Sequence, residues 1–81
     1  MKQVTLYGKP GCHLCEEARE VVLSVRLERE FELVEVDVTL DPGLNRAYGE
    51  RIPVIGVNGE DVFEYFVDRE TLKNRLDRVV S

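Results

Sequence analysis

The chain has 81 residues, of which 43% are hydrophobic and 33% are charged, a balance typical of one folded domain with a modest core. Its formal net charge is -5, which argues against nucleic acid as a partner because phosphate binding needs a basic surface. No apolar run approaches the roughly 20 residues that span a bilayer, so we expect no membrane partner. We expect residues 1–81 to form a single domain.

Taken in chain order, the hydrophobic pattern alternates between the spacing of strands and that of helices. Apolar runs and a period of two predict strands at residues 3–7, 31–38, 54–57 and 61–66. Helical spacing and capping residues predict helices at residues 13–28, 42–48 and 69–80. The predicted order of elements is β-α-β-α-β-β-α.

Capping and turn residues mark several of these boundaries. Asp41 is an N-cap followed by proline at the first helical position, and Gly49 ends that short helix. Asn58 and Gly59 predict a tight hairpin turn in which both residues take positive φ. Asp68 is the predicted cap of the last helix. The apolar stripe of that helix consists of Leu72, Leu76, Val79 and Val80.

The connections between the elements predict the sheet. The first two strands are joined through a helix, so we expect them to be parallel, with a right-handed crossover. The last two strands form an antiparallel hairpin. The expected fold class is α/β, with a mixed four-stranded sheet flanked by helices.

The only two cysteines stand three positions apart, in Cys12-His13-Leu14-Cys15, between the first strand and the first helix. Two thiols at this spacing can close and reopen a disulfide across one helical turn, which is the minimum that thiol–disulfide exchange requires. Cys12 lies where unpaired N–H groups and the positive end of the helix favour a thiolate. We therefore predict that Cys12 is the exposed nucleophile and that Cys15 resolves the mixed disulfide.

Neighbouring charges act on Cys12 in opposite directions. Lys9 lies three residues upstream, favours the thiolate and is a candidate substrate-binding residue. Glu16 and Glu17, one turn along, oppose the thiolate if they lie close to it. His13 would stabilise the thiolate if it were protonated and directed at the sulfur. The alternative, which we favour, is a solvent-exposed His13 at the start of the helix.

A Cys-x-x-Cys motif has interpretations other than redox chemistry. A structural zinc site needs about four ligands, and two thiols with one histidine disfavour such a site within one chain, whereas a site shared across a dimer stays open. A pair of inert, buried thiols is a further interpretation. The first residues contain no signal-peptide core, so we expect a cytoplasmic, reducing location, where a permanent structural disulfide is disfavoured.

Ile52-Pro53 places a proline at the start of the third strand, after a β-branched residue. One interpretation is an ordinary proline at the first position of a strand. The other is a cis peptide bond, which is essentially confined to bonds that precede proline.

Four segments carry a pattern that occurs together in one family: Val4-Thr5-Leu6-Tyr7, Lys9-Pro10-Gly11-Cys12-His13-Leu14-Cys15-Glu16, Ile52-Pro53-Val54 and Asn58-Gly59. The pattern resembles the glutaredoxin-like branch of the thioredoxin-fold superfamily, over nearly the whole chain. The resemblance implies sheet order 2-1-3-4 with the last strand antiparallel. It also implies that Cys12 is the nucleophile and Cys15 the resolving thiol. Beside them Pro53 would be a cis-proline that, with Ile52, presents backbone to the cysteine segment of the substrate.

One stretch departs from the glutaredoxin pattern. Glutaredoxins proper follow the hairpin with a Gly-Gly pair and acidic residues that hold the γ-glutamyl end of glutathione, whereas this chain has Val62-Phe63-Glu64-Tyr65-Phe66-Val67-Asp68. Phe63 and Glu64 carry side chains where the tripeptide would need close approach to the backbone. The chain is similar to the small uncharacterised glutaredoxin-like proteins. We expect a protein disulfide or another small thiol as substrate, with glutathione left open as a co-substrate.

The function that these residues favour is thiol–disulfide oxidoreduction by a monomer without a bound cofactor or metal. One alternative is a redox sensor or binding module without turnover. Another is an iron–sulfur or metal carrier, in which Cys12 and a partner's thiols hold a cluster between two chains.

Overall fold

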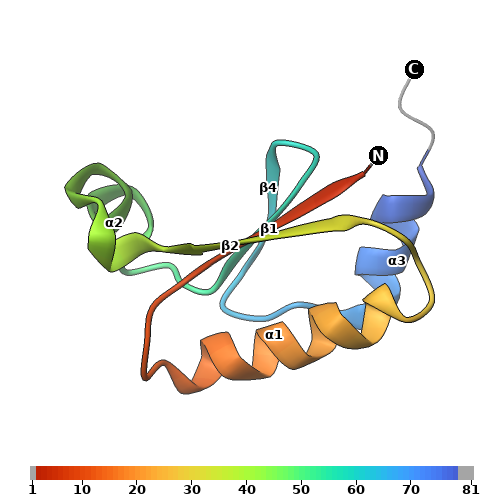
Figure 1. The fold of residues 1–81 in the computed structure, drawn as a ribbon, viewed down its shortest axis with the longest axis horizontal. Helices are drawn as coiled ribbons and strands as arrows, with labels where there is room; N and C mark the ends of the chain where they lie inside the picture. Colours follow the sequence, from red (N-terminus) through yellow and green to blue (C-terminus); the bar gives the residue numbers. More distant parts are fainter. Residues whose placement is uncertain (1, 79–81) are drawn as a thin grey trace.

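A computed structural model describes residues 2–78 and shows the predicted order of strands and helices (Figure 1). The strands are β1 (Gln3–Gly8), β2 (Glu32–Asp37), β3 (Val54–Val57) and β4 (Glu60–Glu64). The helices are α1 (His13–Arg26), α2 (Pro42–Tyr48) and α3 (Arg69–Asp77), and a short 3₁₀ helix, η1, covers Val38–Leu40. Val79 and Val80, which we placed in the last apolar stripe, lie outside the described residues.

The strands form one sheet in the order β2-β1-β3-β4, as the resemblance implied. β1 and β2 are parallel, because α1 returns the chain to the end from which β1 started. β3 is antiparallel to both β1 and β4, so β3 is the strand that runs against the other three. The last strand is antiparallel to its neighbour β3 but points the same way as β1. The predicted α/β class with a mixed four-stranded sheet is confirmed.

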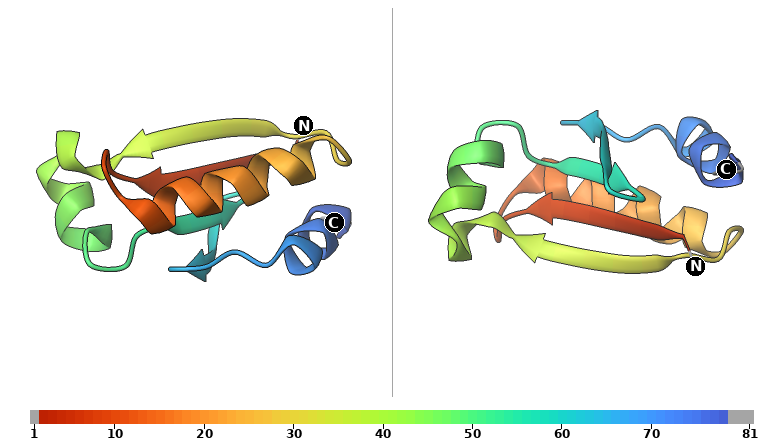
Figure 2. Two further views of the ribbon diagram at one scale, coloured as in Figure 1. Left: turned by 90° about the horizontal axis from the view of Figure 1, so that it is seen from below. Right: turned by 90° about the horizontal axis from the view of Figure 1, so that it is seen from above.

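Helices α1 and α3 cover the same face of the sheet, and α2 lies at the end where β1 and β2 finish (Figures 1 and 2). The main core lies between the sheet and these two helices; its buried residues are Val4, Leu6, Ala18, Val22, Val25, Phe31, Ile55, Val57, Leu72 and Leu76. A smaller cluster lies near α2 and contains the buried Cys15, Val38 and Ile52. The two-thiol motif therefore lies at the α2 end of the molecule. No helix within residues 2–78 is long and apolar enough to cross a membrane.

The predicted caps and the hairpin turn form as expected. The Asp41 carboxylate accepts hydrogen bonds from the N–H groups at the start of α2, the nearer at 2.8 Å, and Asp68 accepts one from the N–H of Thr71 at 2.8 Å. The hydrogen bonds from Thr71 lower the pKa of the Asp68 carboxyl group. Asn58 and Gly59 have φ values of 50° and 89°, which confirms the turn between β3 and β4.

Two predicted strands end earlier than the sequence indicated. β2 ends at Asp37, because the Asp37 carboxylate accepts a hydrogen bond from the N–H of Thr39 at 2.9 Å and starts η1, which was not predicted. β4 begins at Glu60 and ends at Glu64, because Tyr65 turns the chain with a φ of 66°. Both strand ends lie beside the candidate site, so they determine its shape.

The C-terminal ends of α1 and α2 also differ in detail from the prediction. α1 finishes at Arg26, two residues earlier than predicted, and leaves the Leu27 side chain 89% exposed. Gly49 does end α2, but with a right-handed φ of -54° rather than the left-handed conformation that glycine often supplies at this position. A Cβ atom at Gly49 would lie 2.4 Å from the carbonyl oxygen of Asn45. Glycine is therefore required here for space.

Candidate active site

Cys12 is the N-cap of α1, the residue from which the helix begins. Its backbone is extended, with φ -92° and ψ 113°, and its Sγ accepts a hydrogen bond from the N–H of Cys15 at 3.3 Å. An unpaired N–H at the start of a helix stabilises negative charge on the atom that it reaches. Cys12 is half-buried and Cys15 is buried, with 8% of its surface exposed. Both cysteines are free thiols.

The environment of Cys15 favours the protonated thiol over the thiolate. Burial raises the pKa of the Cys15 thiol to about 11, and the hydrogen bond between the two cysteine side chains acts in the same direction. The backbone of Lys9 lowers this pKa, the negative charge of Cys12 raises it, and the Lys9 ammonium group lowers it again. The two thiols of the motif are therefore unequal, with a half-exposed sulfur at the helix start and a buried, protonated sulfur behind it.

Gly8 allows the buried thiol to lie against the end of β1. A Cβ atom at Gly8 would be 3.1 Å from the Sγ of Cys15 and 3.3 Å from its Cβ, closer than most Cβ contacts. In the sequence, Gly8 is part of the turn-like stretch Gly8-Lys9-Pro10-Gly11. Its contact with a thiol seven residues further on has no signal in the spacing of the motif.

The Ile52–Pro53 peptide bond is cis, as the resemblance implied. Ile52 is 7% exposed and belongs to the same buried cluster as Cys15, which places the cis-proline segment beside the thiol pair. The carbonyl oxygen of Pro53 accepts a hydrogen bond from the N–H of Tyr65 at 2.8 Å. Neither the N–H nor the C=O of Ile52 makes a hydrogen bond within residues 2–78. These two groups can pair with an extended peptide.

An aromatic and ionic cluster supports the cis-proline segment from the side of α2. The rings of Tyr7 and Tyr48 stack with centroids 4.4 Å apart and an angle of 15° between their planes. The guanidinium of Arg51 lies 5.0 Å from the Tyr48 ring centroid and pairs with Glu64 at 2.5 Å. The Tyr48 hydroxyl donates to Asp61 at 3.1 Å, and burial together with this carboxylate raises the pKa of Tyr48. Sequence reasoning missed this cluster, since its members share no periodicity.

The stretch that departs from the glutaredoxin pattern is filled by its own side chains. Phe63 packs against the main core, and Glu64 pairs with Arg51. Tyr65 takes positive φ, which is uncommon for a bulky residue, and its hydroxyl donates to the carbonyl of Glu50 at 2.9 Å. The stretch therefore carries side chains with contacts of their own where the glutaredoxin pattern has two glycines.

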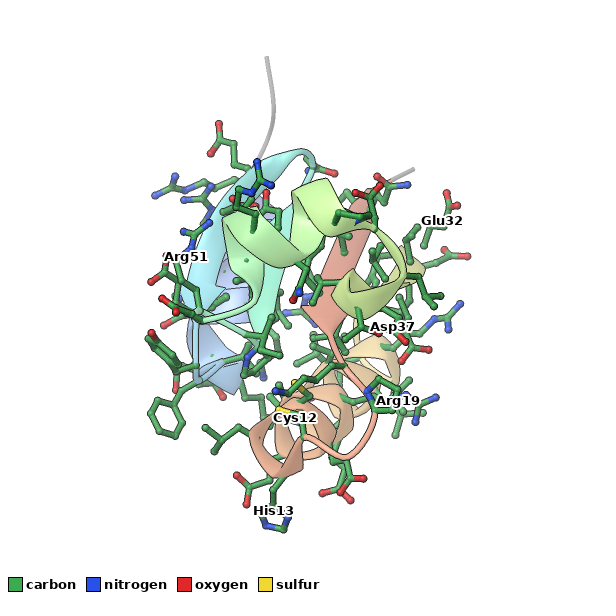
Figure 3. All side chains as sticks on the ribbon, turned by 90° about the vertical axis from the view of Figure 1, so that its left-hand side faces the viewer. Cys12, His13, Arg19, Glu32, Asp37 and Arg51 are labelled. Atoms are coloured by element: carbon green, nitrogen blue, oxygen red, sulfur yellow. The ribbon has the colours of Figure 1, made fainter. Side chains whose placement is uncertain are left out.

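The two basic neighbours of the motif, His13 and Lys9, are both exposed. The His13 side chain is 84% exposed and directed away from the motif, with its Nε2 3.5 Å from Glu17 (Figure 3). This agrees with the solvent-exposed interpretation of His13. Lys9 is exposed at the start of the loop before Cys12, and both its backbone and its charge act on Cys15.

Two open depressions flank the start of α1. The larger, of about 410 Å³, lies on the side of β2 and is lined by Leu6, Gly8, Lys9, Pro10, Gly11, Cys15, Glu16, Arg19, Glu35, Val36 and Asp37. The smaller, of about 150 Å³, lies between α1 and the segment after β4, where Phe66 is 70% exposed. In Figure 3, Arg19 and Asp37 lie on one side of Cys12 and Arg51 lies on the other. The thiol pair therefore separates two different surfaces.

The sheet order, the cysteine pair at the start of α1 and the cis-proline beside it define a protein of the thioredoxin fold. Solved structures agree with this. A mutant thioredoxin from Halobacterium salinarum aligns with a TM-score of 0.71 over 99% of this chain and 78% of that chain, at 23% identity. At this identity the likeness shows the fold alone.

The family follows from closer matches. The model of the family described as "Glutaredoxin-like domain (DUF836)" matches residues 3–77, and the chain belongs to this family. Uncharacterized protein Rv0508 of Mycobacterium tuberculosis is 30% identical over 94% of this chain and 84% of its own length. Protein Ne2328 from Nitrosomonas europaea aligns with a TM-score of 0.81 at 28% identity over 94% of this chain and 92% of that one. Protein XcR50 from X. campestris aligns with a TM-score of 0.76 at 31% identity, over 91% of this chain and 95% of that one.

Proposed function

We propose that this chain is a thiol–disulfide oxidoreductase that acts in a reducing compartment such as the cytoplasm. One observation supports this proposal above the others. The half-exposed Cys12 sulfur accepts a hydrogen bond from the N–H of Cys15 at the start of α1, while the Cys15 sulfur lies buried behind it. This arrangement supports attack by Cys12 and resolution by Cys15. The fold and the family are compatible with redox chemistry.

The reaction would proceed in two exchanges. The Cys12 thiolate attacks one sulfur of a substrate disulfide, a new S–S bond forms, and the second substrate sulfur leaves as a thiolate and takes a proton. Cys15 then loses its proton and attacks the Cys12 sulfur, the Cys12–Cys15 disulfide forms, and the first substrate sulfur leaves. The substrate gains two electrons, and the cysteine pair loses two.

The pKa of Cys15 changes in the direction that this sequence of steps requires. After burial, the largest influences that raise it come from Cys12, as a hydrogen-bond partner and as a negative charge. Both disappear when Cys12 becomes part of a mixed disulfide. The pKa of Cys15 therefore falls at the stage where its thiolate is needed.

The cis-proline segment supports a protein disulfide as the substrate. Ile52 leaves its N–H and C=O for an extended chain, and Phe66 exposes an apolar ring nearby on the segment after β4. Phe63 and Glu64, which contact the main core and Arg51, stand where glutaredoxins have the Gly-Gly pair that approaches the γ-glutamyl end of glutathione. We therefore propose a protein disulfide as the main substrate.

The decisive experiment is capture of a mixed disulfide with Cys15→Ser. Without the resolving thiol, Cys12 should remain bonded to the first substrate that it attacks, and a non-reducing gel should show bands that a reductant removes. Cys12→Ser is the matched control and should capture nothing. Equal capture by the two variants, or none by Cys15→Ser, would contradict the assigned roles.

Glutathione provides a separate test of specificity. We expect slow turnover with a glutathione mixed disulfide compared with a glutaredoxin that has the Gly-Gly pair, because Phe63 and Glu64 occupy that position. The comparison uses the same peptide–glutathione disulfide at equal enzyme concentration. Rates equal to those of the glutaredoxin would show that this stretch does not determine the substrate.

A further inference from the structure

Tyr65 lies at the centre of a strained three-residue turn directly after β4. The N–H of Phe66 donates to the carbonyl of Glu64 at 2.7 Å, and Tyr65 between them has a φ of 66°. A hydrogen bond between residues two apart, closed over a central residue of positive φ, is characteristic of the rarer and strained form of the γ-turn. Such conformations persist where the surrounding structure fixes them, and they cluster at functional sites. Tyr65 is therefore a candidate functional residue.

Two hydrogen bonds join Tyr65 to the cis-proline segment, and they fall on either side of Ile52. The Tyr65 hydroxyl donates to the carbonyl of Glu50 at 2.9 Å, and its backbone N–H donates to the carbonyl of Pro53 at 2.8 Å. Between these two carbonyls, the N–H and C=O of Ile52 make no hydrogen bond within residues 2–78. Tyr65 therefore holds the residues that flank the backbone groups left for a substrate.

The Arg51 side chain holds the same segment in a different way. It pairs with Glu64 at 2.5 Å and donates to the carbonyl of Ala47 at 3.2 Å. These contacts anchor a side chain and leave the neighbouring peptide planes able to rotate. The bonds from Tyr65 act on the backbone itself, because they fix the peptide planes on either side of the two planes that carry the Ile52 N–H and C=O.

We propose that Tyr65 is a positioning residue for the substrate, which fixes the orientation of the Ile52 N–H and C=O so that an extended segment of a protein disulfide can pair with both. The inference rests on the proposed function, in which this segment receives the chain that carries the attacked disulfide. Both hydrogen bonds weaken steeply when donor and acceptor are misaligned, so the two groups must be oriented together. Tyr65 acts on binding of a substrate backbone and not on the reactivity of Cys12.

Amide hydrogen exchange of Tyr65→Phe tests the positioning without any substrate. The variant keeps the ring and loses only the hydroxyl that bonds to Glu50. The N–H of Arg51 donates to the carbonyl of Tyr48 at 2.8 Å within the same segment. It should exchange about three- to tenfold faster in the variant, the factor that one neutral hydrogen bond contributes. Unchanged exchange at Arg51 would overturn the proposal, because the segment would then be held without the hydroxyl.

Two disulfides of different chemistry separate positioning from thiol reactivity. A peptide disulfide has a backbone that can pair with Ile52, whereas bis(2-hydroxyethyl) disulfide has none. In single-turnover measurements with pre-reduced Tyr65→Phe, the half-saturating concentration of the peptide should rise about three- to tenfold at an unchanged maximal rate. The rate constant with the small disulfide should change less than about twofold, which is below the contribution of one hydrogen bond. Equal effects on both disulfides, or no effect on the peptide, would overturn the proposal.

Ser24→Ala is the matched control, because each of the two variants removes one hydroxyl that donates to a backbone carbonyl. The Ser24 hydroxyl donates to the carbonyl of Val21 at 2.7 Å, and Ser24 lies about three turns along α1 from Cys12. The control should leave the half-saturating concentration of the peptide within about twofold of wild type. A rise equal to that of Tyr65→Phe would show a general effect of a lost hydrogen bond, and the role of Tyr65 would be wrong.

The two proposals can fail separately. A wild-type protein that reduces neither disulfide would contradict the proposed function, and this inference with it. If the wild-type protein reduces both disulfides and Tyr65→Phe behaves identically, only the role of Tyr65 is overturned.

Discussion

At the scale of single residues, the exposure of the two sulfurs separates their chemistry. Because the pKa of Cys15 is raised to about 11, only about one Cys15 in a thousand is ionised at pH 8, and its reactivity should rise as pH approaches that value. We predict that iodoacetamide labels Cys12 well before Cys15 between pH 6 and 9 (a window set by ordinary thiol pKa values of about 8.5). Peptide mapping after timed labelling measures this. Labelling of Cys15 at the rate of Cys12 would contradict the assigned roles.

Gly8 offers a second test at this scale. Gly8→Ala should destabilise the fold by about 1–3 kcal/mol, because the added methyl group overpacks the site against the Cys15 sulfur. Urea denaturation of the single and double variants gives the coupling energy. In a Cys15→Ala background part of the cost should disappear, since the Sγ 3.1 Å away is gone while the Cβ 3.3 Å away remains. An unchanged cost in that background would show that Gly8 is required for another reason.

Much of the candidate site could be predicted from the sequence, because its chemistry is local. Cys12 and Cys15 lie on one helical turn, so their spacing and the strand before them indicate which sulfur faces out. The cis form at Pro53 required the resemblance to a family. Gly8, Arg19 and the tyrosine stack could not be predicted, since their contacts join residues far apart in sequence that only the fold brings together.

At the scale of elements, α3 is held by a few buried leucines. Leu72→Ala should destabilise the protein by about 2–5 kcal/mol, because Leu72 is fully buried in the main core and the substitution leaves a cavity. Leu27→Ala is the matched control and should change stability by less than about 0.5 kcal/mol, because Leu27 is 89% exposed. Urea midpoints of the two variants measure the difference. Equal shifts would mean that α3 contributes little to the folded state.

At the scale of elements, hydrophobic patterns predict the interiors of helices and strands better than their ends. Periodicity predicts the interior of α1 and of every strand, because burial on one face repeats at a fixed spacing. It cannot predict that Asp37 starts a 3₁₀ turn or that Tyr65 takes positive φ. Those ends depend on single hydrogen bonds, from Thr39 to Asp37 and from Tyr65 to Glu50, and a hydrophobic pattern carries no information about them.

At the scale of the whole molecule, we propose that the reduced protein is a monomer. Its mass should then be 9.3 kDa by sedimentation, and small-angle scattering should give a radius of gyration near 12.1 Å. A doubled mass in a colourless sample would contradict the monomer. A doubled mass with visible absorbance after anaerobic purification would instead support the cluster carrier, since iron–sulfur clusters bridge chains through thiolates.

The stacked tyrosines have a practical consequence for work on this protein. The chain contains three tyrosines and no tryptophan, and two of the three, Tyr7 and Tyr48, pack against the cluster that holds both cysteines. A disulfide quenches tyrosine emission on contact more strongly than a thiol does. The tyrosine fluorescence of the unlabelled protein should therefore change when Cys12 and Cys15 form a disulfide. That change would report the redox state of the protein without an added label.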